Sequence, residues 1–173
     1  MTLFRQEIHD TFHLEFGRLV HAYAQLDFAV GIALDWLGPH NGEDVQGLLV
    51  GRVPLAQRLD KLKFLVRKTY QAAGQDALAE FEAWFTRACE LKAIRNDYVH
   101  ARWHVPDFSP SDDPVVMMMP LNWQWTPANQ PETQAMALST LAAQVIELKK
   151  MSKQFDNLTK RDAATASPAS SCQ

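Results

Sequence analysis

A single apolar stripe constrains the fold of this 173-residue chain more than any other feature. Between positions 12 and 37, large apolar residues recur at alternating spacings of four and three, over about seven helical turns. This spacing places them on one face of one long helix. The stripe consists of Phe12, Phe16, Leu19, Tyr23, Leu26, Val30, Ala33 and Leu37. A lone helix cannot bury such a face, so we expect it to pack against other long helices in antiparallel fashion.

Three further helices follow from the same periodicity. Gly38 and Pro39 end the first helix. The second is predicted over about residues 54–73, the third from about Asp76 to position 100, and the last over about residues 132–158.

The segment between the third and the last helix has a different character. Prolines at positions 106, 110 and 114 indicate a loop, and residues 115–125 are rich in Val, Met and Trp, which favours a short strand or hairpin. The expected fold class is all-α: an antiparallel bundle of about four long helices with a short extended, hairpin-like insertion before the last helix. We expect one domain over residues 1–159 and a flexible tail over residues 160–173.

Composition is typical of a globular protein, with 47% hydrophobic and 21% charged residues. No apolar run is long enough and free enough of charge to span a bilayer, so no membrane partner is expected. The first ten residues include acids and lack the apolar region of a secretory signal. The two cysteines, Cys89 and Cys172, form no disulfide framework. These features predict a cytoplasmic protein.

Positive charge gathers in one segment although the formal net charge is −3. Residues 52–68 contain six cations against Asp60 alone, a local charge of +5. These cations are Arg52, Arg58, Lys61, Lys63, Arg67 and Lys68. The stripe fits either a contact surface for a polyanion or a solvated helix face. On the first interpretation the candidate RNA contacts are Arg52, Arg58 and Lys61, together with Arg102.

The run Arg95-Asn96-Asp97-Tyr98-Val99-His100 closes the third predicted helix and carries the strongest chemical signal. Arginine binds phosphate through a bidentate fork, and histidine transfers protons near neutral pH. On a straight helix, however, Arg95 and His100 point about 140° apart. Either the long arginine side chain wraps around the helix, or a second copy of the chain brings its own run alongside.

Arg95-Asn96, three residues and then His100 resemble the signature of the HEPN superfamily, small α-helical bundles that include many metal-independent ribonucleases of toxins and phage defence. The long first helix and Trp103 after the motif are similar too. The resemblance covers roughly residues 12–158. It implies an endoribonuclease acting as a homodimer through the motif face, with RNA as substrate, an antitoxin protein as a possible partner, and no cofactor or metal.

The resemblance also implies a role for each motif residue. His100 would take the proton of an RNA 2′-hydroxyl or protonate the leaving oxygen, which is worth about 10²–10⁴-fold. Arg95 would hold the phosphate and stabilise the developing charge. Asn96 would orient His100 or bond a phosphate oxygen. Asp97 and Tyr98 are possible accessory residues, although Asp97 also fits a local cap and Tyr98 a core position.

Two other functions remain open beside the enzyme. Some members of the superfamily only bind RNA or nucleotides, so the chain also fits a regulatory module that binds nucleotide, RNA or a protein partner. The chain also fits a purely structural oligomerisation protein. The motif also fits a surface ion pair of Arg95 with Asp97 or Glu90, beside a helix-terminal histidine.

The other constellations are weaker. His9 with His13, and His100 with His104, have the spacing of a metal-binding pair, but neither lies in an HExxH motif or near a cysteine cluster. No metal site is therefore predicted. Trp103, Trp123 and Trp125 fit either stacking on bases or packing on the helices.

Overall fold

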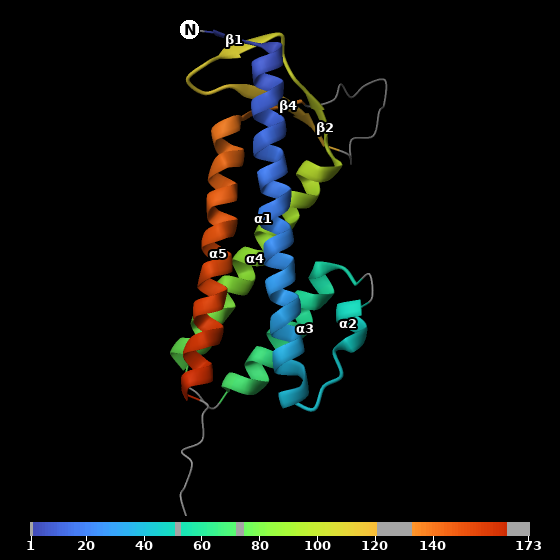
Figure 1. The fold of residues 1–173 in the computed structure, drawn as a ribbon, viewed down its shortest axis with the longest axis vertical. Coiled ribbons are helices and arrows are strands. Elements are labelled where there is room, and N and C mark those ends of the chain that lie inside the picture. The colour runs from blue at the N-terminus through green and yellow to red at the C-terminus, as the bar shows by residue number, and fades with distance from the viewer. Residues whose placement is uncertain (1, 51–52, 72–74, 121–132, 166–173) are drawn as a thin grey trace, which may run out of the picture. The chain divides into compact units, whose positions relative to one another are not determined.

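The computed structural model describes residues 2–50, 53–71, 75–120 and 133–165 (Figure 1). Within these residues the helices are α1 (Arg5–His40), α2 (Gln46–Val50), α3 (Leu55–Tyr70), α4 (Gln75–His100) and α5 (Leu138–Thr165). The strands are β1 (Thr2–Phe4), β2 (Arg102–His104), β3 (Phe108–Pro110), β4 (Val115–Met119) and β5 (Gln134–Ala137).

The prediction of an all-α bundle is wrong, because the strands form two small antiparallel sheets and the fold is a mixed one. In one sheet β1 pairs with β3, with Leu3 opposite Ser109. The other has the order β2-β4-β5, with Trp103 opposite Met118 and Val116 opposite Met136.

The missed strands have a physical explanation. Runs of three residues, such as β1, β2 and β3, are too short to show an alternating pattern. β4 has that pattern, with Val116 and Met118 buried, and it covers the start of the predicted strand. β5 consists largely of helix-forming residues, so its pairing with β4 outweighs local propensity. Residues 121–125 lie outside the described part.

The predicted apolar stripe is confirmed: seven of its eight residues are buried in α1, and Phe16 is half-buried. The helix ends at His40, two residues beyond Gly38. A Cβ at Gly38 would lie 2.7 Å from the Val45 side chain, so a glycine is required there. The sequence analysis did not predict α2. The helix α5 begins later than predicted and extends to Thr165; residues 166–173 lie outside the described part.

The chain divides into two units, and α1, α4 and α5 each contribute to both. The first unit comprises residues 1–24 and 90–149. It contains all the described strands, and Figure 1 shows β1, β2 and β4 around the N-terminal part of α1. Its buried residues include Ile8, Phe12, Leu19, Tyr23, Leu91, Tyr98, Val116, Met118, Leu141 and Val145. The predicted motif lies in this unit.

The second unit comprises residues 25–89 and 150–173. Its core is built from helices, with Tyr70 stacked on Phe81 and Trp84 stacked on Phe155 at centroid distances of 5.2 and 4.4 Å. The Trp84 indole donates a hydrogen bond to the carbonyl of Met151 (3.0 Å). The basic segment of the sequence lies in this unit. The single domain predicted for residues 1–159 stays a prediction.

Candidate functional site

The predicted motif forms the last turns of α4, which ends at His100. The carbonyl of Tyr98 is among the last four of the helix, which have no donor within it. Trp103 Nε1 donates a hydrogen bond to this carbonyl, with an N···O distance of 3.0 Å. The side chain of Trp103 on β2 therefore closes the end of the helix that carries His100.

The ring of Trp103 fixes this arrangement further. It contacts Phe12 and Phe16 of α1, with centroid distances of 5.0 and 6.0 Å, and Tyr98 of α4 edge to face at 5.7 Å. Of the two interpretations of Trp103, packing is the one that the structure shows. Trp123 and Trp125 lie outside the described residues.

Arg95 is half-buried, and its described contacts include no acidic side chain. Its guanidinium lies 5.2 Å from the centre of the Tyr23 ring, a cation–π contact. Its Nη1 donates a hydrogen bond to Asn96 Oδ1 (3.1 Å), while its buried Nε has no hydrogen-bond partner. Among the described residues no ion pair of Arg95 with Asp97 is found, and the alternative of a pair with Glu90 stays a prediction.

The other polar motif residues differ in exposure. His100 and Asp97 are exposed, and Asn96 is half-buried beside Arg95. Neither Asn96 nor Arg95 has a described contact with His100. The described contacts therefore do not join Arg95 to His100, in keeping with their angular separation on a helix.

Tyr98 lies in the core and is only 7% exposed. Its hydroxyl accepts a hydrogen bond from Gln144 Nε2 of α5 (2.9 Å). The structure thus places Tyr98 in the position of a core residue that anchors α4. The sequence analysis missed Gln144, and it identified Tyr23 only as part of the apolar stripe, because helical spacing does not show which helices face each other.

Four of the five described cations of the basic segment pair with acids of the chain itself. Arg58 donates a hydrogen bond to Asp27 Oδ2 (2.6 Å), and Lys61 pairs with Glu43 (2.7 Å). Glu82 of α4 pairs with both Lys63 (2.8 Å) and Arg67 (2.5 Å). Lys68 donates a hydrogen bond to the carbonyl of Asn41 (2.9 Å). This pairing favours the interpretation of a structural helix face.

The two remaining candidate RNA contacts lie elsewhere. Arg102 is exposed on β2, where it is opposite Met119. Arg52 lies outside the described residues. Arg102 belongs to the first unit, whereas Arg58 and Lys61 belong to the second.

Two of the carboxyl groups that pair with α3 have lowered pKa values. The hydrogen bond from Arg67 lowers the pKa of Glu82, and the charge of Lys63 acts in the same direction. The hydrogen bond and the charge of Lys61 lower the pKa of Glu43. Both carboxylates are thus held in their charged forms.

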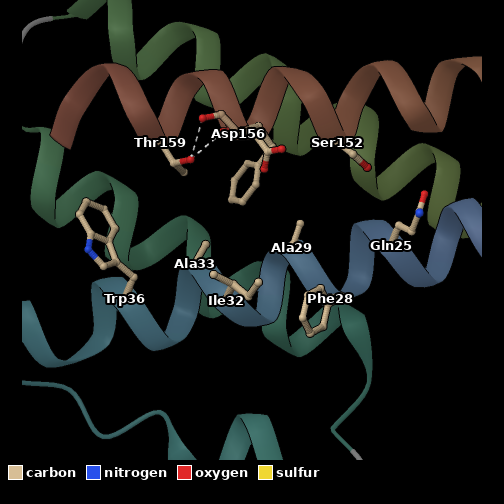
Figure 2. A pocket seen from close by; sticks show the side chains of 10 residues that line it. Gln25, Phe28, Ala29, Ile32, Ala33, Trp36, Ser152, Asp156 and Thr159 are labelled. Carbon is tan, nitrogen blue, oxygen red and sulfur yellow. Dashed lines mark hydrogen bonds between the residues drawn. The ribbon is translucent and has the colours of Figure 1, made fainter. Parts of the chain in front are cut away.

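A hollow of about 570 Å³ lies in the second unit between α1 and α5. Figure 2 shows Phe28, Ile32 and Trp36 of α1 on one side and Ser152, Asp156 and Thr159 of α5 on the other. Phe28 is 70% exposed, and the α1 side of the hollow is largely apolar whereas the α5 side carries Ser152, Asp156 and Thr159. None of the predicted site residues lines it.

The described part of the chain contains no group of three or more His, Cys, Asp or Glu side chains arranged to hold a metal ion. No helix among the described residues is long and apolar enough to cross a membrane. Comparison of the chain with protein-family models, with curated proteins and with solved structures gives no match.

Proposed function

We propose that this chain is a metal-independent endoribonuclease of the HEPN type, in which Arg95 of one copy and His100 of a second copy act on the same phosphodiester. The observation that carries the proposal is the state of Arg95: a half-buried cation, held by Tyr23 and Asn96, with no carboxylate among its described partners. A partly buried cation without a counterion is costly, and an anionic oxygen is the group that it binds best.

The chemistry follows from the two side chains. The 2′-oxygen of RNA attacks the adjacent phosphorus, the bond from phosphorus to the 5′-oxygen breaks, and a 2′,3′-cyclic phosphate forms. The imidazole of His100 takes the 2′-hydroxyl proton or gives a proton to the leaving 5′-oxygen. The guanidinium of Arg95 stabilises the negative charge that develops on the phosphoryl oxygens. DNA lacks the 2′-hydroxyl and is not cleaved.

Three neighbouring residues position this machinery. Asn96 accepts a hydrogen bond from Nη1 of Arg95 and restricts the guanidinium, while the ring of Tyr23 holds it through a cation–π contact. Trp103 closes the helix end at Tyr98, two residues before His100. The site therefore depends on Trp103 as a positioning residue.

A homodimer through the motif face satisfies the geometry that one chain does not. In a twofold dimer the same surface patch faces its own copy, so Arg95 of one protomer meets His100 of the other. The resemblance to the HEPN superfamily suggests a cytoplasmic toxin or phage-defence effector, with an antitoxin protein as a possible partner.

The test is incubation of the purified protein with total RNA in excess chelator. The wild type is expected to cleave, and Arg95→Ala and His100→Ala to lose at least about 100-fold in rate. Arg67→Ala and His21→Ala are matched controls, since both side chains are exposed and outside the site. Equal cleavage by all five proteins would reveal a contaminant and overturn the proposal. RNA binding without cleavage would identify a binding module instead.

A further inference from the structure

We propose that His9 and His13 form a binding site for one late first-row transition-metal ion, such as Ni²⁺, Cu²⁺ or Zn²⁺, on the exposed surface near the start of α1. The two residues are one helical turn apart, and both are exposed. This site is separate from the proposed RNA cleavage, which uses no metal.

The distance between the ring nitrogens carries the proposal. His9 Nε2 and His13 Nε2 lie 3.0 Å apart, joined by a hydrogen bond that a shared metal ion would replace, and the ring centroids are separated by 4.1 Å. Two nitrogens that bind one ion at about 2.1 Å each, at an angle of about 90–109°, lie roughly 3.0–3.4 Å apart. The pair therefore already has the spacing of a chelate, which the sequence spacing alone did not establish.

A second observation concerns the other nitrogen of His9. Asp10 Oδ1 lies 3.6 Å from His9 Nδ1, and Gln6 Nε2 donates a hydrogen bond to the same carboxylate oxygen (2.8 Å). The carboxylate is too far away for a hydrogen bond to Nδ1, but its charge favours a proton on that nitrogen, which leaves Nε2 of His9 with the lone pair that a metal ion needs. Carboxylate, histidine and metal commonly occur in this order in metal sites.

The chemistry of the pair selects the ion. Neutral imidazole suits Zn²⁺, Cu²⁺ and Ni²⁺, and affinity for such ligands is highest for Cu²⁺. Because the described residues supply no third ligand, water completes the coordination. The i, i+4 pair His100 and His104 lacks this geometry, because α4 ends at His100 and His104 lies on β2.

The test is a calorimetric titration of the untagged, metal-free full chain with NiCl₂ in the absence of RNA. We expect one ion per chain, and His9→Ala and His13→Ala are each expected to weaken binding by at least about tenfold. His21→Ala, on the same helix, and His104→Ala serve as controls and are expected to bind as the wild type does. Equal binding by the double variant His9→Ala/His13→Ala and the wild type would overturn the proposal.

Electron paramagnetic resonance of the Cu²⁺-loaded wild type gives a measurement that depends on no variant. Coupling of the copper to two imidazole nitrogens is expected. Coupling to one imidazole nitrogen, or to none, would also overturn the proposal. Neither readout involves RNA, so failure here leaves the ribonuclease proposal unaffected.

Discussion

The basic face of α3 and the end of α4 both present arginines, but the chain treats them differently. Arg58 on α3 and Arg95 on α4 each have a buried Nε without a hydrogen-bond partner. Arg58 has Asp27 as a counterion, whereas Arg95 has an amide and an aromatic ring. A guanidinium that already donates hydrogen bonds to a carboxylate has fewer donors, and less uncompensated charge, with which to bind phosphate. We therefore expect the partner of each arginine, more than the number of cations nearby, to decide whether it can bind phosphate.

The largest expected effect is on Arg95. Arg95→Lys keeps the charge but loses the planar fork and its stacking on Tyr23, so RNA cleavage is expected to fall by about 100-fold. Arg67→Lys on α3 is the matched control and is expected to cleave as the wild type does. The measurement is the initial rate on a labelled RNA. If the Lys variant cleaved at the wild-type rate, a positive charge alone would be sufficient, and the proposed role of the guanidinium of Arg95 would be contradicted.

The next largest effect is expected at the ion pair between Arg58 of α3 and Asp27 of α1. Asp27→Ala leaves Arg58, whose side chain is only 17% exposed, without its counterion. The free energy of unfolding is expected to fall by about 1–3 kcal/mol, measured by urea denaturation, while RNA cleavage at a temperature where the variant is folded stays unchanged. An unchanged free energy of unfolding, or a loss of cleavage by the folded variant, would contradict the structural role of this pair.

A smaller effect is expected from Trp103→Phe, which keeps an aromatic ring beside Phe12 and Phe16 but removes the hydrogen bond to Tyr98. The loss of one hydrogen bond is expected to cost about 1 kcal/mol of stability. Because the helix end carries His100, the cleavage rate is expected to fall while RNA affinity is retained. Wild-type stability together with a wild-type rate would remove Trp103 from the site.

The smallest effect concerns Glu82, whose pKa is lowered by Arg67 and Lys63. A lowered pKa contributes stability above the unfolded value of 4.5, and this stability is lost as the pH falls through the folded value. Glu82→Gln is therefore expected to be less stable than the wild type by about 0.5 kcal/mol at pH 7, with exposure and salt limiting the size. The gap should narrow below pH 4.5. Urea denaturation at pH 7 and pH 3 measures it, and a constant gap would contradict the assignment.

The sequence predicted those parts of the fold that depend on long periodic patterns. The stripe of α1 and the position of the motif at the end of α4 followed from helical spacing. The two sheets did not, because β1 and β3 are joined by pairing between residues more than 100 positions apart, as in Leu3 with Ser109. A strand of three residues carries no sequence pattern from which such long-range pairing could be predicted.

The candidate site was predictable to a similar extent. Residue types pointed to Arg95 and His100, but spacing did not show that Tyr23 supports the guanidinium or that Trp103 closes the helix. Charge counting identified the basic segment but not its counterions, since Asp27, Glu43 and Glu82 lie on other segments of the chain. Each of these contacts depends on tertiary structure.

The central claim is that Arg95 and His100 act from different copies, and a mixed dimer tests it most directly. Arg95→Ala and His100→Ala chains carrying different affinity tags are co-expressed and purified through both tags in succession. One of the two equivalent sites in this dimer keeps both residues, so we expect about half of the wild-type cleavage rate. A mixed dimer as inactive as each parent variant, beside an active wild-type dimer purified the same way, would contradict it.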